Sequence, residues 1–197
     1  MKKRILSICL SLALLLILLP AGALTARAET QSGTCGEHLN WEFNEATNTL
    51  TISGEGDMYD YLYTLRSPWS DLPVKTLIIR NGVTSIGAYA FAAIETLENI
   101  TLSDTITHIA PWAFWCCRGI TKLTLPDSIT EIGDCAFYFC ENLSEINAPK
   151  NLKSISYDIF DETAFYNDAE NWFNDALYFD QWLITCRHSQ ADSVPIR

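Results

Sequence analysis

Apolar residues recur along this chain at a fixed interval of 23 positions between Val83 and Thr163. One column holds Ile86, Ile109, Ile132 and Ile155, and a second holds Phe91, Phe114, Phe137 and Phe160. Further columns hold Leu97, Ile120 and Leu143, and then Ile100, Leu123 and Ile146. Several columns with one period indicate a repeat array in which each unit is a small supersecondary structure. We expect the isoleucine and phenylalanine columns to form its core.

Each unit has two halves with different patterns. Residues 99–103 alternate apolar and polar side chains, as a strand buried on one face does, and residues 122–126 and 145–149 repeat this alternation. Residues 109–114 carry apolar groups at i, i+4 and i+5, which fits a turn or a short helical piece. Neither half can bury its apolar face alone, so we expect the units to stack with strands ~4.8 Å apart in a parallel ladder.

The repeats follow the consensus I-G-x-x-A-F-x-x-C-x-x-L-x-x-I-x-L-P. The third unit matches at Ile132, Gly133, Ala136, Phe137, Cys140, Leu143 and Ile146, and the second matches as well, whereas the first has Ile94 where cysteine is expected. This pattern resembles the BspA-like leucine-rich repeat family of bacterial secreted and cell-surface proteins. The resemblance implies a short leucine-rich-repeat solenoid of about four 23-residue units over residues 74–163, and a role in adhesion or protein binding.

The segments that flank the repeats have strand-like patterns of their own. Residues 29–36 are polar and expected to be loose, while residues 39–43 and 49–53 alternate on either side of a turn. We expect residues 29–73 to form a β-hairpin cap followed by a degenerate half-repeat, because Pro68 lies 23 positions before Phe91. Residues 164–197 are predicted to hold a second hairpin, either as a C-terminal cap or as part of a longer architecture.

The N-terminus has the pattern of a secretory signal peptide. Lys2, Lys3 and Arg4 precede an apolar run over residues 5–19, and Ala26 and Ala28 supply the small residues of a cleavage site. An uncleaved membrane anchor would need about 20 apolar residues, so cleavage after Ala28 is preferred. We therefore predict a secreted or cell-surface protein with a signal peptide over residues 1–28.

Charge excludes two classes of partner. The predicted leader carries four of the 13 basic residues and none of the 24 acidic ones, so the remaining chain has a formal charge of −15. Such a surface repels phosphate groups, so neither nucleic acid nor a membrane surface is an expected partner after leader cleavage. The oligomeric state is open.

Six cysteines follow the leader: Cys35, Cys116, Cys117, Cys135, Cys140 and Cys186. An even number outside the cell is compatible with disulfides, but Cys117 and Cys140 share a repeat column in which the family resemblance implies small buried residues. Free thiols are preferred there, because a buried cysteine behaves as a small hydrophobe, although stacked neighbours are within disulfide reach.

The sequence contains no recognisable catalytic or metal-binding constellation. His38, His108 and His188 lie in separate segments, outside any H-E-x-x-H or G-x-S-x-G motif, and His108 is interpreted as a solvated turn residue. Seven carboxylates lie between Asp158 and Asp180 without the spacing of a calcium loop, so they are interpreted as solvated surface. We predict no enzymatic activity, no metal site and no cofactor.

Two candidate binding surfaces remain. Aromatic columns hold Tyr89 with Trp112 and Trp115 with Tyr138, and they either seal the core or present rings to a glycan or a protein. Polar columns on the strand face hold Thr76, Asn99, Lys122 and Glu145, and then Ile78, Thr101, Thr124 and Asn147. Recognition of an extracellular protein along the strand face is the first hypothesis, glycan binding by the aromatic columns is the second, and a structural spacer or fragment of a longer surface protein is the third.

Overall fold

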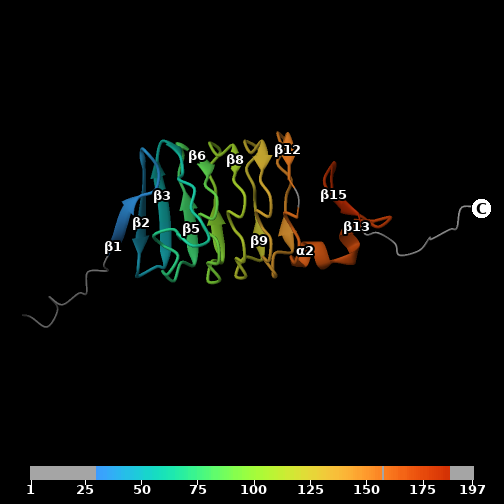
Figure 1. The fold of residues 1–197 in the computed structure, drawn as a ribbon, viewed down its shortest axis with the longest axis horizontal. Helices are drawn as coiled ribbons and strands as arrows, with labels where there is room; N and C mark the ends of the chain where they lie inside the picture. The colour runs from blue at the N-terminus through green and yellow to red at the C-terminus, as the bar shows by residue number, and fades with distance from the viewer. Residues whose placement is uncertain (1–29, 157, 187–197) are drawn as a thin grey trace, which may run out of the picture.

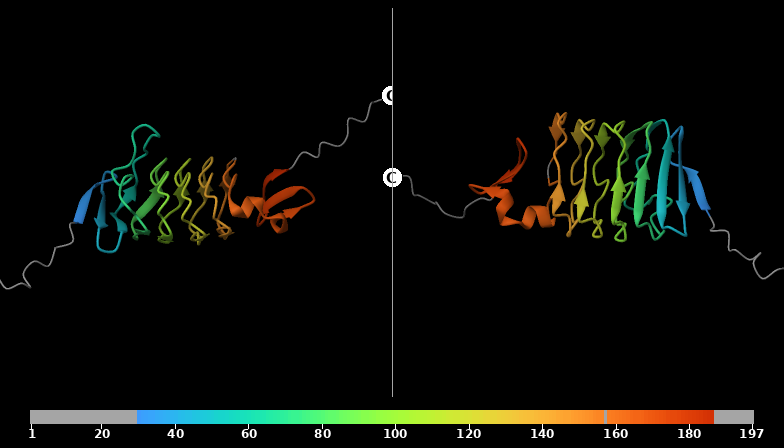
Figure 2. Two further views of the ribbon diagram at one scale, coloured as in Figure 1. Left: turned by 90° about the horizontal axis from the view of Figure 1, so that it is seen from below. Right: turned by 180° about the vertical axis from the view of Figure 1, so that it is seen from behind.

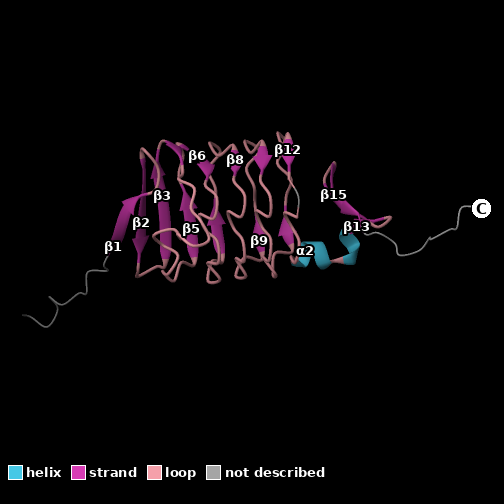
Figure 3. Cartoon of the chain, viewed as in Figure 1, coloured by secondary structure: helices cyan, strands magenta, loops and turns pink. Residues whose placement is uncertain are grey.

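The computed structural model describes residues 30–156 and 158–186, and the repeats within them form one row of stacked coils (Figure 1). Successive coils lie side by side and pair through parallel strands (Figure 3). The predicted solenoid with a parallel ladder is therefore confirmed. The repeats have turns between their strands, and among the described residues helical elements occur only after Thr163.

The first ladder is the one that the alternating pattern predicted. It consists of two strand pairs in separate sheets, β5 (Thr76–Ile79) with β7 (Asn99–Thr101), and β9 (Lys122–Leu123) with β11 (Glu145–Ile146). Residues 23 positions apart are direct partners, as in the pairs Thr76 with Asn99 and Lys122 with Glu145. Each coil therefore places the same repeat position over its neighbour, which is what a common period requires.

A second parallel ladder runs along another side of the coils and was not predicted. It consists of β4 (Gly56–Asp57), β6 (Val83–Ile86), β8 (His108–Ile109), β10 (Glu131–Ile132) and β12 (Ser154–Ile155). The interpretation of His108 as a turn residue is wrong, because it lies in β8 and its Nδ1 is 3.3 Å from Glu131 on the next strand.

The turns of the coils close a third side and carry the core spine. Their backbones also bond from coil to coil, since the amide of Phe91 donates to Ala113 O at 2.8 Å and that of Phe114 to Ala136 O at 2.9 Å. The rings of Phe91, Phe114, Phe137 and Phe160 are fully buried and stack at 5.3, 5.6 and 6.0 Å between centroids. Trp69 extends this spine toward the N-terminus, 5.6 Å from Phe91.

The cysteine column lies beside this spine. Cys117 and Cys140 are fully buried free thiols, and their sulfur atoms donate to the backbone oxygens of Phe91 and Phe114 at 3.1 Å. Burial raises the pKa of the Cys140 thiol to about 12 and that of Cys117 well above its usual value. Both thiols therefore stay protonated and unreactive, and they act as small packing groups.

The N-terminal end of the ladder is covered by antiparallel strands. The predicted hairpin is formed by β2 (Leu39–Asn44) and β3 (Thr49–Gly54), and β3 pairs in parallel with β5. The expectation that residues 29–36 are loose is wrong, because β1 (Thr30–Thr34) pairs with β2 along its whole length. The polar sequence of β1 gives no apolar alternation; its strand conformation comes from the open edge of β2.

The C-terminal end has a different architecture. After the last coil come α2 (Ala164–Asn167) and the 3-10 turn η1 (Ala169–Asn171), followed by a separate sheet of β13 (Trp172–Phe173), β14 (Ala176–Phe179) and β15 (Trp182–Cys186). The hairpin pairing of β14 with β15 agrees with the sequence pattern, and Phe179 packs 4.9 Å from the ring of Phe160. None of the helices in the described residues has the length and apolar character needed to cross a bilayer. The predicted signal peptide lies outside these residues.

Candidate functional site

The turn side of the solenoid is built from left-handed backbone. Two residues in each turn have φ between 53° and 61°, and none of them is glycine. These two columns are Tyr89, Trp112, Cys135 and Asp158, and then Ala93, Cys116, Phe139 and Glu162. The conformation costs about 1–2 kcal/mol per residue, and it persists because the coil-to-coil hydrogen bonds fix it. The turn is therefore a rigid scaffold for outward side chains.

Aromatic side chains on these turns, together with Tyr63 from a loop before them, pack against one another in a continuous surface group. This group, called the aromatic strip below, consists of Tyr63, Tyr89, Trp112, Trp115, Tyr138 and Phe139. Tyr89 and Trp112 stack at 5.9 Å with an interplanar angle of 4°, and Trp112 meets Tyr138 at 6.0 Å edge to face.

The strip lies outside the buried core. None of its six side chains belongs to the core cluster, and all are half-buried except Tyr63, which is 66% exposed. The rings therefore contact one another above the core cluster, and both interpretations of these columns, sealing the core and binding a ligand, remain predictions. Half-exposed rings on a rigid turn offer flat apolar area to a ligand.

Two tryptophans outside the strip donate hydrogen bonds from Nε1. Trp69 donates from Nε1 to Ala90 O at 2.9 Å, and Trp172 donates to Tyr166 O at 2.7 Å. Within residues 30–156 and 158–186, no hydrogen bond is formed by Nε1 of Trp112 or Trp115. Since buried tryptophans normally have a partner for this N–H group, these two donors are available to bound molecules.

A projecting loop, residues 59–66, overhangs the first coils of the strip (Figure 2, left, the teal loop). It is anchored at its base, where the amide of Tyr61 donates to Ala88 O at 2.8 Å and Asp60 accepts from the amide of Ala88 at 2.7 Å. Its tip is closed by two reciprocal hydrogen bonds of 3.1 Å between Leu62 and Leu65. These two leucines are 60% and 69% exposed, so the loop presents apolar side chains on an ordered frame.

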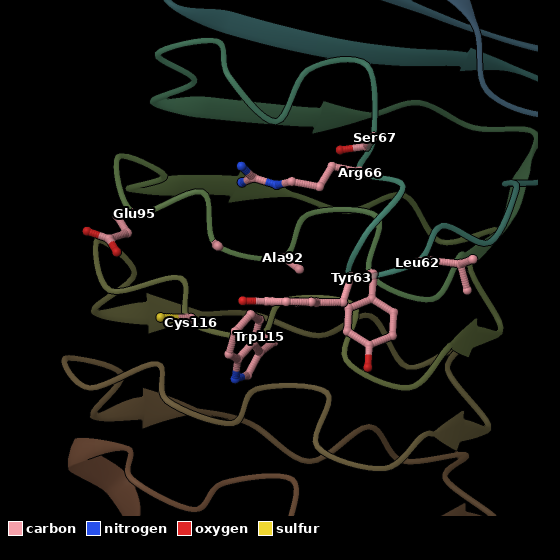
Figure 4. Close-up of a pocket in the computed structure, with 10 residues that line it drawn as sticks. Leu62, Tyr63, Arg66, Ser67, Ala92, Glu95, Trp115 and Cys116 are labelled. Carbon is pink, nitrogen blue, oxygen red and sulfur yellow. The ribbon is translucent and has the colours of Figure 1, made fainter.

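Loop and strip enclose a cleft of about 370 Å³ (Figure 4). Leu62, Tyr63 and Arg66 line it from the loop, and Trp115 lines it from the second coil. The cleft exists because the first coil has the small Ala92 in the column that holds Trp115 and Tyr138 in the following coils. Its volume suits one or two large side chains or a single sugar ring.

The opposite end of the strip is acidic. The columns of Trp112, Trp115 and Phe139 end in the last coil with carboxylates, which are Asp158, Asp161 and Glu162. Burial raises the pKa of Asp161, and the charges of Asp158 and Glu162 add to this shift. Among the described residues none of these three carboxylates forms a salt bridge, and no group of three or more metal-ligating side chains occurs.

The strand face brings its predicted residues into register but uses several of them internally. Nζ of Lys122 pairs with the carboxylate of Glu145 at 2.5 Å. The side-chain amide of Asn147 accepts from the amide of Leu125 at 2.8 Å and donates to its carbonyl at 2.9 Å. Asn147 thus replaces a strand hydrogen bond, while Asn99, Thr101 and Thr124 remain exposed.

Sequence reasoning missed the loop, and it identified the carboxylates from Asp158 to Asp180 without connecting them to the aromatic columns. In the sequence, the loop is indicated by four large apolar residues close together, which are Tyr59, Leu62, Tyr63 and Leu65. In the structure each of them is at least 50% exposed. The signal for the acidic end is the continuation of the aromatic columns into the last coil, where Asp161 takes the position of Tyr138.

A model of the BspA type leucine rich repeat region matches residues 69–169 in six copies, where the sequence columns indicated about four units. No curated protein matches. A leucine-rich repeat protein from Eubacterium ventriosum has a similar structure, with 23% identity and a TM-score of 0.53 over 68% of this chain and 42% of that one. A leucine rich cell surface protein from Faecalibacterium prausnitzii is similar over 69% of this chain and 47% of its own, with 19% identity and a TM-score of 0.40. The chain therefore spans less than half the length of these relatives.

Proposed function

This chain belongs to the BspA-type leucine-rich repeat family, and from that membership we propose that it is an extracellular binding module that recognises a protein through the aromatic strip and its cleft. Proteins of the family are generally secreted or at the cell surface, and their repeats suggest protein interaction.

Export would use the leader over residues 1–28, and mass spectrometry of the mature protein tests this. A mature chain starting at Glu29 is expected, and a chain that retains residues 1–28 contradicts export by cleavage.

The observation that carries this proposal is an ordered apolar surface that the core does not need. Exposed apolar clusters on soluble proteins mark interaction sites, and aromatic anchors dominate the energy of protein interfaces. Residues 59–66 and the strip supply both, on a loop and turns that are hydrogen-bonded before any partner arrives. Pre-ordering reduces the entropy lost on binding.

The same rings could instead stack on sugars, and this is the second candidate. The nearly parallel, half-exposed pair Tyr89 and Trp112 favours it, because a flat aromatic face suits a pyranose ring. The unbonded Nε1 donors would serve sugar hydroxyls equally well. The strand face remains a third surface, with Lys122 as its central charged residue.

Four variants separate these possibilities when the purified protein is tested against a panel of extracellular matrix proteins and a glycan array. Trp115→Ala removes a wall of the cleft, and Ala92→Trp fills the cleft with a side chain that the next coil already accommodates. Lys122→Glu reverses a charge on the strand face. Phe173→Ala is the matched control, because it removes an aromatic ring that is 70% exposed and outside the strip.

We expect at least a tenfold loss of protein binding in Trp115→Ala and Ala92→Trp, equivalent to about 1.4 kcal/mol, and unchanged binding in Phe173→Ala and Lys122→Glu. Retention on glycans alone, lost in Trp115→Ala, would establish the sugar-binding alternative. Loss only in Lys122→Glu would move the site to the strand face. Binding to neither panel would favour a spacer role.

A further inference from the structure

We propose that the aromatic strip selects a basic, extended segment of its protein partner, an inference that rests on the binding function proposed for this surface. The strip is not uniform along the solenoid. It begins at the apolar loop tip and ends at three carboxylates, and this polarity restricts which segment fits.

The polarity is built into the repeat columns. Along the column of outward residues the chain places Ala92, Trp115, Tyr138 and then Asp161. The left-handed columns end in the same coil with Asp158 and Glu162. All three columns therefore have an acidic residue in the same coil. The carboxylate side chains lie on the same outward side of the solenoid as the aromatic rings.

Within residues 30–156 and 158–186, this acidic end has no counter-charge. No lysine or arginine occurs from residue 154 to residue 186, and no described cation pairs with Asp158, Asp161 or Glu162. By contrast, Arg118 in the middle coils is already held by Glu95 and Glu141 at 2.7 and 2.8 Å. The unpaired carboxylates repel one another, and a cation from outside the chain would relieve that repulsion.

The neighbouring rings favour an organic cation over a metal ion. Tyr138 and Phe139 meet edge to face at 4.6 Å, and both rings are half-exposed beside the carboxylates. A guanidinium or ammonium group binds to an aromatic face and to carboxylates together. Metal coordination is not supported, since the described residues contain no group of three metal-ligating side chains.

The dimensions indicate a short peptide segment. The ring of Tyr63 lies 5.5 Å from that of Trp115, and the column continues from Trp115 through Tyr138 to Asp161 in two coil steps of ~4.8 Å each. At ~3.3 Å per residue, about five extended residues follow this path of ~15 Å. The matching segment carries an apolar side chain for the cleft at one end and arginine or lysine at the other.

A peptide-display selection tests this inference. A random twelve-residue library is selected on the wild-type protein after depletion on Trp115→Ala, and selected peptides are then measured on Asp158→Asn/Glu162→Gln by fluorescence polarisation in 50 mM and 500 mM salt. Glu42→Gln/Glu55→Gln is the control, because it changes net charge equally at exposed positions near the other end of the chain.

We expect peptides enriched in arginine and lysine, with affinity reduced at least tenfold by Asp158→Asn/Glu162→Gln and by high salt, and unchanged in the control pair. Enriched peptides that are neutral or acidic, or equal affinity for both double variants, would overturn the charge selection while leaving the binding surface intact. If no peptide is enriched over Trp115→Ala, the proposed function of the strip fails and the inference fails with it.

Discussion

At the scale of the residue, Tyr61 combines a packing role with an unsatisfied polar group. Its ring meets Trp69 at 5.7 Å, which ties the projecting loop to the spine, but its hydroxyl is buried without a hydrogen-bond partner in the described part of the chain. Burial also raises the pKa of this phenol, so it stays neutral. Such an orphaned group costs about 1–3 kcal/mol.

Tyr61→Phe should therefore stabilise the protein by about 1 kcal/mol, because it removes the hydroxyl and keeps the ring. Thermal unfolding followed by circular dichroism measures the change. Tyr59→Phe serves as the control, since its side chain is 50% exposed and should show no effect. A loss of stability in Tyr61→Phe would show that the hydroxyl has a partner such as a bound water.

At the scale of the element, the turn side shows where prediction from sequence ends. The first ladder and the spine follow from apolar periodicity, because each buried position repeats its side-chain type. The second ladder holds the isoleucine column, but its short strands run directly into the turns, so the apolar spacing of residues 109–114 fitted a turn or a short helical piece. The left-handed turns carry Tyr89, Trp112 and Phe139 rather than glycine. Glycine is the residue type that normally indicates a positive φ, so the sequence does not reveal this backbone conformation.

The same turns give an element-scale prediction. Ala93 has φ of 58°, whereas its neighbour Ala92 does not have positive φ. Ala93→Gly should stabilise the fold by about 0.5–1 kcal/mol, because relief of left-handed strain exceeds the entropic cost of glycine. Ala92→Gly should instead destabilise it by about 0.5–1 kcal/mol. Urea unfolding measures both, and effects of equal sign would contradict the strain argument.

At the scale of the whole molecule, the cleft could not be predicted because it depends on tertiary placement. Its walls come from a loop at residues 59–66 and from coils more than 20 positions later, and only the folded chain brings Tyr63 within 5.5 Å of Trp115. The sequence columns did identify Tyr89, Trp112, Trp115 and Tyr138 as a group. What they lacked was the direction of these side chains, which the left-handed backbone sets.

The stacked spine makes the array depend on each coil. Phe114 lies between Phe91 and Phe137, so Phe114→Ala removes a fully buried ring from the middle of a core that repeats in one dimension. The expected loss is about 3–5 kcal/mol, comparable with the total stability of a small domain. Since each coil contacts mainly its neighbours, a central break separates the N-terminal hairpin from the C-terminal coils.

We therefore expect Phe114→Ala to lower the melting temperature sharply or to leave the chain unfolded at 25 °C. The matched control is Phe173→Ala, which removes the same side chain from a position that is 70% exposed and should cost less than about 0.5 kcal/mol. Calorimetry distinguishes the two, and two separate transitions in Phe114→Ala would show that the halves fold independently. An unchanged melting temperature would be incompatible with a buried spine, because no relaxation of neighbouring coils fills a cavity of phenylalanine size without cost.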